Sequence, residues 1–307
     1  MKKLNQMLLV VAALLLSLNV SAQKALRYNL QVGETYQLKQ HTTQSIEQSV
    51  AGMTQNMKTT MGGDVAVTVK GKSGNVYSSE VIFKSMLFKL EGPMMNMTYD
   101  SKDANADKTN PLNKTFDLIV GHPFDVKFDD RGNVVEVKGF ETIANNVVSA
   151  FSDNPQQAEM MKKQLAGQFS DESMKGNLSN MFITYPEEKV KVGSEWTNTN
   201  TISAPFVIDN QFDYKVDGIS KEQVDLSGVG TMATKEGQTV EQMGMTQHIN
   251  LDGDLSFTAN VNAKTGWPIE IKINQKLDGN VAVESPQLPT PMEIPMKITG
   301  VLTYKGM

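Results

Sequence analysis

Residues 124–138 read Phe-Asp-Val-Lys-Phe-Asp-Asp-Arg-Gly-Asn-Val-Val-Glu-Val-Lys, and they give the clearest indication of the fold class. Apolar and polar residues alternate on both sides of Gly132, which is the pattern of strands that have one buried face. The central glycine supplies the positive φ angle that a tight hairpin needs. The stretch therefore predicts a β-hairpin.

A second copy of this pattern lies later in the chain. Residues 257–272 also alternate, with Gly266 at their centre. A shorter motif recurs in the same order, because Val32-Gly33 precedes Tyr36 as Val192-Gly193 precedes Trp196. Two motifs in the same order indicate two similar halves, residues 23–139 and 182–307, although matches this short also arise without duplication.

Apolar residues recur at every second position in four further stretches, which we expect to be strands: residues 65–69, 212–216, 255–261 and 296–304. Glycines punctuate these stretches, and Asp252-Gly253-Asp254 predicts a turn. The result is an antiparallel sheet, of which one face can meet water while the other must be covered.

The region between the halves is helical in pattern. Apolar residues from Phe140 to Phe151 recur at three- and four-residue spacing. Asn154 and Ser170 are suitable N-caps for a second and a third helix, and a short helical turn can begin at Pro111. We therefore predict a mainly β (α+β) fold: a curved antiparallel sheet or half-barrel with a helical segment, residues 140–181, packed on its concave face.

The first twenty-two residues have the features of a secretory signal. Lys2 and Lys3 precede an apolar run over residues 7–16, and small residues end the segment at Ala22. The run is too short to span a bilayer, which takes about 20 apolar residues. We expect cleavage before Gln23, no membrane span afterwards, and a protein that is periplasmic, extracellular or associated with the outer membrane.

Composition narrows the class of partner. Removing residues 1–22 leaves 27 basic and 34 acidic side chains, a formal net charge of −7. Because the basic surface that binds phosphates is missing, we expect no nucleic-acid partner. The chain has no cysteine, so the fold must be stable without disulfides.

The sequence offers little for catalysis. Its three histidines, His41, His122 and His248, are far apart, and the HExxH, GxSxG and P-loop motifs are absent. Gly228 and Gly230 imitate a dinucleotide-binding fingerprint, but no helical pattern follows them. We predict a non-catalytic protein without a cofactor, and a hydrolase triad assembled in space is the alternative.

Methionine is unusually frequent, with seventeen residues after Ala22. Met94, Met95 and Met97 cluster beside Pro93, and thioethers are soft ligands that favour Cu(I). The same side chain also fills irregular gaps in cores and lines adaptable apolar surfaces. The abundance of methionine therefore supports three alternative hypotheses: a copper site at these three residues, core packing, or an apolar ligand pocket.

The Val-Gly turns, the glycine-centred hairpin, residues 140–168 and the run from Tyr185-Pro186 to Gly193 resemble an uncharacterised family of exported proteins from Gram-negative bacteria, classed as a domain of unknown function. The architecture is also similar to the periplasmic half-barrel lipoprotein carriers, in which a curved sheet and helices enclose an apolar cavity. That likeness implies a lipid or other apolar small molecule as partner.

The sequence thus favours an exported, non-catalytic protein of the cell envelope that binds a lipid or other apolar ligand between sheet and helices. A ligand-free structural or interaction module of the envelope is the alternative, and Met-rich copper binding is the third hypothesis. Protein partners are not indicated by any motif.

Overall fold

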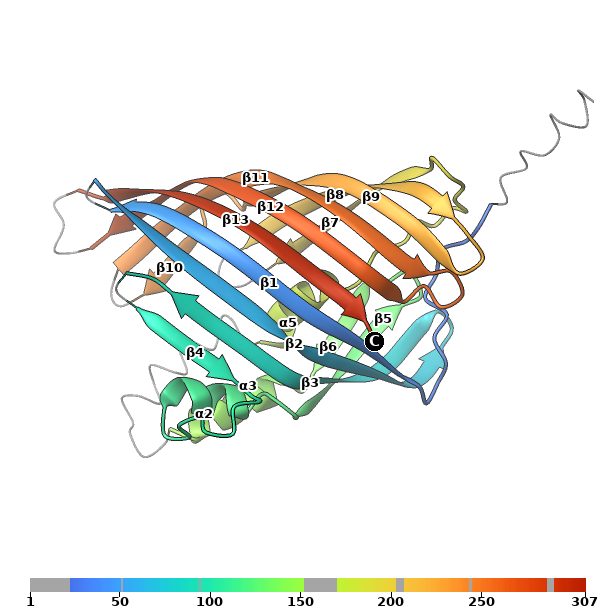
Figure 1. The fold of residues 1–307 in the computed structure, drawn as a ribbon, viewed down its shortest axis with the longest axis horizontal. Coiled ribbons are helices and arrows are strands. Elements are labelled where there is room, and N and C mark those ends of the chain that lie inside the picture. Colours follow the sequence, from blue (N-terminus) through green and yellow to red (C-terminus); the bar gives the residue numbers. More distant parts are fainter. Residues whose placement is uncertain are drawn as a thin grey trace, which may run out of the picture.

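The computed structural model describes residues 23–50, 52–93, 95–151, 170–202, 207–242, 245–285 and 290–307. The predicted signal and the predicted helix over residues 154–169 lie outside these ranges. Within them the chain forms one curved, unclosed antiparallel sheet and three short helices (Figure 1). The mainly β class predicted from the alternating stretches is confirmed.

The strands are β1 (Thr35–Val50), β2 (Met53–Ser73), β3 (Val76–Glu91), β4 (Asn96–Asp100), β5 (Pro123–Asp129), β6 (Val134–Lys138), β7 (Glu195–Ile202), β8 (Ile208–Ile219), β9 (Gln223–Thr234), β10 (Thr239–Gln242), β11 (Met245–Asn262), β12 (Pro268–Glu284) and β13 (Met292–Gly306). The helices are α2 (Pro111–Asp117), α3 (Phe140–Ser149) and α5 (Asp171–Ser179).

The strand order is β6-β5-β3-β2-β1-β13-β12-β11-β9-β8-β7, with β4 paired to β3 and β10 to β11. The first and last strands of the chain pair at the centre, where Leu38 lies opposite Gly306. Strands on both sides of the helical region therefore belong to one sheet. Its two edges, β6 and β7, are joined by the residues between them.

Helix α5 lies where these two edges face each other. It packs against β6, β7 and α3, and its buried Met174 and Leu178 belong to the same apolar core as the sheet. The Ser170 hydroxyl accepts a 3.0 Å hydrogen bond from the amide of Ser173, so the predicted N-cap is confirmed. The helix thus ties together two edges that do not pair.

The predicted hairpin over residues 124–138 is β5 and β6. Gly132 has a φ of +95°, and the Asp129 carboxylate accepts hydrogen bonds from the amides of Arg131 and Asn133. These hydrogen bonds stabilise the turn, so the Asp129 carboxylate has a structural role as an acceptor for backbone amides. The other predicted hairpin is β11 and β12, with Gly266 at a φ of +70°.

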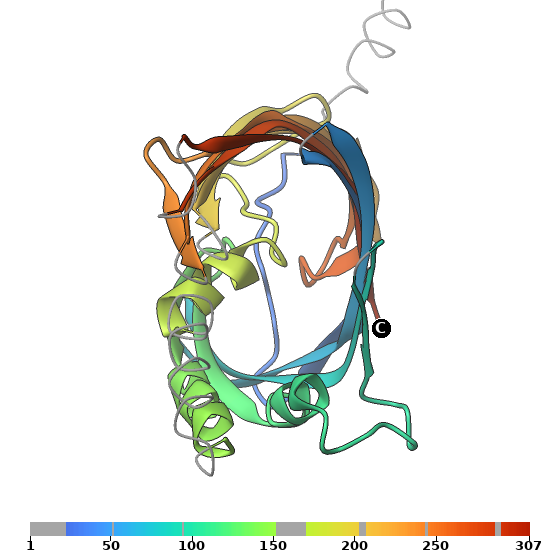
Figure 2. The same cartoon turned by 90° about the vertical axis from the view of Figure 1, so that its left-hand side faces the viewer.

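One end of the sheet is filled by the chain itself. The segment before β1 is extended and crosses the interior there (Figure 2), with Leu26, Tyr28 and Leu30 buried. Tyr28 makes ring contacts with Phe128, Phe182, Tyr185 and Trp267. Segments from distant parts of the sequence therefore build one aromatic core at this end.

Glycines within the strands allow neighbouring strands to approach closely. The predicted turn at Gly253 is wrong, because Gly253 lies in the middle of β11. A Cβ atom there would be 1.9 Å from the carbonyl oxygen of Lys276, and one at Gly230 would be 2.1 Å from that of Gln211. These glycines therefore mark close backbone approach rather than chain reversal.

Among the described residues, no helix combines the length and the apolar character that crossing a bilayer would require.

Candidate functional site: the uncharged inner face

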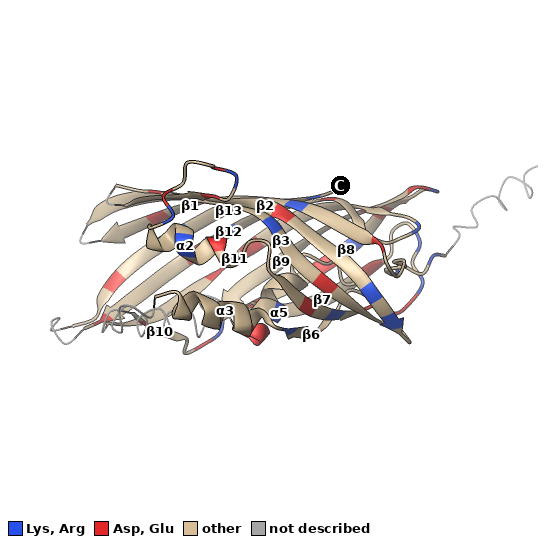
Figure 3. Cartoon of the chain, turned by 90° about the horizontal axis from the view of Figure 1, so that it is seen from below, with Lys and Arg blue, Asp and Glu red and all other residues tan. Residues whose placement is uncertain are grey.

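The alternation of side chains separates two chemically different faces of the sheet. The inward positions of β1, β7, β8, β9, β11, β12 and β13 hold only apolar residues, glycine and uncharged polar residues. The outward positions hold the charges, and acidic and basic residues are interspersed along the strands (Figure 3). The outer face therefore suits water, while the inner face suits an uncharged occupant.

Burial along the inner face changes from one end to the other. At the filled end, Leu38 is 1% exposed and its partner Val65 is 2% exposed. Further along the same strands, Ile46 and its partners Met57 and Ile298 are only partly buried. Inward apolar residues that are partly buried in this region are Ile46, Val50, Met57, Met61, Met292, Ile294, Met296 and Ile298.

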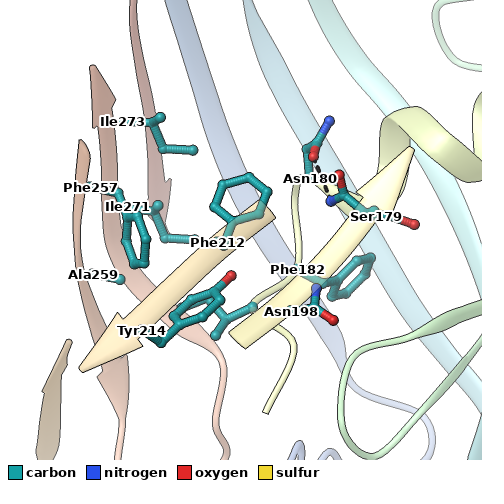
Figure 4. A pocket seen from close by; sticks show the side chains of 12 residues that line it. Ser179, Asn180, Phe182, Asn198, Phe212, Tyr214, Phe257, Ala259, Ile271 and Ile273 are labelled. Carbon is teal, nitrogen blue, oxygen red and sulfur yellow. Dashed lines mark hydrogen bonds between the residues drawn. The ribbon is translucent and has the colours of Figure 1, made fainter. Parts of the chain in front are cut away.

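A small pocket lies between the end of α5 and the inner face (Figure 4). Phe257, Ala259, Ile271 and Ile273 form one wall, while Ser179, Asn180 and Asn198 lie on the other. Asn200 also lines the pocket. Its volume of about 20 Å³ admits little more than one water molecule. Small-molecule sites typically measure about 300 Å³ or more, so a whole lipid does not fit between α5 and the sheet.

Two asparagines of the polar wall, Asn180 and Asn200, belong to a hydrogen-bonded chain whose third member, Asn210, does not line the pocket. Asn200 Nδ2 donates to Asn180 Oδ1 at 2.9 Å, and Asn210 Nδ2 donates to Asn200 Oδ1 at 2.9 Å. Asn200 and Asn210 are cross-strand partners on β7 and β8, and Asn180 is the C-cap of α5. Asn210 is 3% exposed, and among the residues that the structure describes its Oδ1 has no hydrogen-bond partner.

Tyr214 lies on β8, on the same face of the strand as Asn210. Its ring is stacked on Trp196 at a centroid distance of 4.9 Å, and the side chain lines the pocket (Figure 4). Burial raises the pKa of Tyr214 above its usual range, so the phenol is neutral near physiological pH. The pocket thus presents uncharged hydrogen-bonding groups.

Sequence reasoning missed these asparagines. The signal was present in residues 195–202, where Trp196, Asn198, Asn200 and Ile202 occupy every second position and hence one face of a strand. Asn180 and Asn210 carry no such signal, because only the tertiary fold brings them to Asn200.

The structure describes two of the three methionines that we considered as copper ligands. Met94 lies outside the described residues. Met95 precedes β4 and is 55% exposed, whereas Met97 lies on β4 opposite Leu90 and is partly buried. Copper binding at these residues stays a prediction.

The three histidines occupy separate elements. His41 is exposed on β1, His122 precedes β5, and His248 on β11 lies 3.2 Å from the Glu284 carboxylate on the outer surface. They are not part of the inner face. The prediction of a non-catalytic protein stays a prediction.

A family model for a family of unknown function, DUF6263, matches residues 74–268, more than half of the chain. The chain belongs to this family. The resemblance to a domain of unknown function is thus confirmed. No curated protein is similar to this DUF6263 chain in sequence.

Solved structures with a similar course of the chain include one titled for lipid-protein interactions in lipovitellin, with a TM-score of 0.46 and 9% identity. The match covers 89% of this chain and 25% of the lipovitellin chain, so the protein spans about a quarter of that relative. The outer membrane protein OprG from Pseudomonas aeruginosa has a TM-score of 0.30 and 6% identity, with 94% and 99% covered. An outer membrane channel from Pseudomonas putida F1 has a TM-score of 0.24 and 7% identity, with 91% and 97% covered.

Proposed function

We propose that the protein is an exported, non-catalytic binding protein of the cell envelope that holds a lipid-like apolar ligand on the inner face of its sheet. The observation that carries the proposal is that Ile46, Met57 and Ile298 are only partly buried on the same face that is fully buried at Leu38 and Val65. The ligand would cover these three residues, as the segment before β1 covers the inner face at the filled end.

Hydrophobic burial gives the physical reason. Removing apolar surface from water stabilises by about 25 cal/mol per Å², so an apolar face left open to water favours an apolar occupant. Methionine side chains at Met57, Met61 and Met296 suit this role because they adapt to ligands of varied shape. The sequence suggested a ligand between helix and sheet, but the pocket beside α5 is too small for a lipid. We therefore propose that the ligand lies on the partly buried part of the inner face.

The proposal can be tested with a matched pair of substitutions on β13. Ile298 faces inward and is partly buried, while its neighbour Thr299 faces outward and is exposed. A charge at position 298 would have to be buried against a lipid chain, which is costly, whereas a charge at position 299 stays in water. We expect Ile298→Lys to reduce binding at least tenfold and Thr299→Lys to leave it unchanged.

The probe is a diacylglycerol with a photoreactive group on one acyl chain, added to the full chain secreted with its own signal. Cross-links should map to inward residues of β1, β2 and β13. Thermal unfolding of both variants checks that they fold. Labelling confined to outward residues, or no labelling of the folded protein, would overturn the proposal in favour of a ligand-free structural or interaction module.

A further inference from the structure

We propose that the end of the sheet opposite to the filled end is a docking surface for a lipid bilayer that carries little negative charge. Uncharged residues between its strands, which we call the rim, would insert into the surface of the bilayer. This inference goes beyond the proposed function, because it concerns where the protein binds rather than what its inner face holds. The rim residues that carry it are Gly52, Met53, Pro93, Met95, Thr290 and Pro291.

Strand pairing brings the rim together from distant parts of the sequence. Gln48 on β1 pairs with both Gln55 on β2 and Met296 on β13, so the connection between β1 and β2 lies beside the start of β13. Glu91, the last residue of β3, pairs with Lys58 on β2, so the connection to β4 follows at the same end. In Figure 1 the two connections and the start of β13 lie at the left-hand end of the sheet.

The two ends of the sheet differ in charge. All six rim residues are exposed and uncharged, and the largest of them, Met53 and Met95, are 65% and 55% exposed. The connections between β5 and β6, between β8 and β9 and between β11 and β12 lie at the filled end and contain Asp130, Arg131, Lys221, Glu222 and Lys264. The filled end therefore suits water, whereas the rim presents apolar side chains without a charge among them.

The filled end also exposes apolar residues, but only singly. Val32 is 58% exposed and Val192 is 51% exposed, and each lies in a turn with a charged residue close by, Glu34 and Lys191. Exposed apolar side chains that are scattered in this way are normal in soluble proteins, whereas a group of them marks an interaction site. The two valines therefore serve as matched controls for the two methionines.

The rim continues into the apolar inner face. Met53 is paired with Val50 across the β1-β2 hairpin, and alternation places Met53, Gln55 and Met57 on the same side of β2. A lipid that leaves a bilayer at the rim would therefore pass no charged side chain of β2 before it reaches the partly buried Met57. Apolar side chains that insert into a bilayer surface gain the burial that water denies them. This continuity favours a bilayer over a polar protein surface as the partner.

The charges nearest to the rim decide which bilayer fits. Glu91, Glu284 and Glu293 each directly adjoin a connection at this end, while the nearest lysines on β3 and β13, Lys89 and Lys297, lie further from it. Acidic side chains repel the negative surface potential of anionic lipids over about one Debye length. The rim should therefore prefer zwitterionic lipids to anionic ones.

A first experiment uses the absence of cysteine from the chain, which allows each end to be labelled at one position. Met53→Cys and Met95→Cys report on the rim, and Val32→Cys and Val192→Cys report on the filled end. Each variant of the full secreted protein carries an environment-sensitive fluorophore and is mixed with phosphatidylcholine vesicles. We expect the emission to shift to the blue at both rim positions and to stay unchanged at the filled end.

A second experiment measures vesicle affinity by flotation. The double variant Met53→Glu/Met95→Glu should bind phosphatidylcholine vesicles at least about tenfold more weakly than the unaltered chain, because charges are costly to insert into a bilayer. The control is Val32→Glu/Val192→Glu, which adds the same charge at similar exposure and should stay within about twofold of the unaltered chain. Thermal unfolding checks that both variants fold. Addition of phosphatidylglycerol to the vesicles should weaken binding of the unaltered chain.

Several outcomes would overturn the inference. These are no binding of the unaltered chain to phosphatidylcholine vesicles, equal affinities of the two double variants, and blue shifts at all four labelled positions. Stronger binding to vesicles with phosphatidylglycerol would overturn the stated lipid preference. If vesicles are not bound and Met53→Glu/Met95→Glu dissociates a dimer in analytical ultracentrifugation, the rim is an interface between copies of this chain.

Failure of the proposed function is distinguishable from these outcomes. The photoreactive diacylglycerol is added without vesicles, so it labels the inner face whether or not the rim binds a bilayer. Labelling without vesicle binding overturns the docking surface alone. Vesicle binding through the rim without labelling overturns the proposed ligand and supports the docking surface.

Discussion

The Tyr185 hydroxyl donates a 2.6 Å hydrogen bond to the carbonyl oxygen of Gly266, the central glycine of the β11-β12 hairpin. The amide of the same residue donates to the carbonyl oxygen of Arg131 in the β5-β6 hairpin. One tyrosine thus connects two hairpins whose central glycines, Gly132 and Gly266, are 134 residues apart in the sequence. Tyr185 is fully buried, so neither bond competes with water.

Tyr185→Phe should therefore destabilise the fold at the filled end. The substitution keeps the ring contact with Tyr28 but leaves the Gly266 carbonyl without this donor, which costs about 1–3 kcal/mol. Denaturant unfolding should show a lower midpoint and an unchanged slope. Tyr304→Phe is the control, because the Tyr304 hydroxyl has no hydrogen-bond partner within the described ranges. Equal midpoints for the two variants would contradict the role given to Tyr185.

Gly132→Ala should be among the most damaging single-methyl additions. A Cβ atom would lie 2.5 Å from the carbonyl oxygen of Ile183 and 2.7 Å from the Tyr28 ring, and φ is +95°. We expect a loss of at least about 2 kcal/mol, because both backbone strain and a steric clash are imposed. Equilibrium unfolding in urea measures the loss.

A comparison with Gly74 separates the cost of backbone strain from the cost of steric clash. Gly74 also has a positive φ, +60°, but a Cβ atom there would meet nothing within 4 Å. Gly74→Ala should therefore cost only the strain, about 1 kcal/mol. If both alanine variants lose the same stability, the contact between Gly132 and the Ile183 segment contributes nothing.

The hairpins could be predicted from the sequence because their information is local. In residues 124–138 and 257–272, alternation and one central glycine specify strand, face and turn together. Ser170 and Pro111 likewise marked α5 and α2 through local hydrogen-bonding chemistry.

The long-range features could not be predicted in this way. Pairing of β1 with β13 joins residues about 260 positions apart, and no local pattern specifies that register. Gly253 resembled a turn residue because flanking aspartates and glycine are typical of turns, whereas in the fold it permits the close approach of β12. The link between Asn180 and Asn200 depends on where α5 docks, which the sequence does not state.

Alkaline pH should unfold the protein. Burial raises the pKa of Tyr304 to about 12, and burial also raises the pKa values of Tyr28, Tyr185 and Tyr214 above their usual range. Since the folded pKa values exceed the unfolded value of 10.0, this stabilisation is fully present below pH 10 and is lost as pH rises towards 12. Tyrosinate absorbance and circular dichroism, recorded together against pH, should change in one transition. Ionisation of most tyrosines near pH 10 with the sheet intact would contradict the burial described above.

Truncating Leu178 should loosen the edges of the sheet before its centre. Leu178 is 2% exposed on α5, the helix that packs against both β6 and β7. Leu178→Ala should cost about 2–5 kcal/mol, as is usual for a buried leucine. Because α5 contacts both edges, amide exchange should rise more at β6 and β7 than at the paired centre of β1 and β13. Glu172→Ala, on the same helix but exposed, should change neither stability nor exchange by more than about 0.5 kcal/mol. A uniform rise in exchange across all strands would mean that α5 stabilises the sheet as a whole rather than joining its edges.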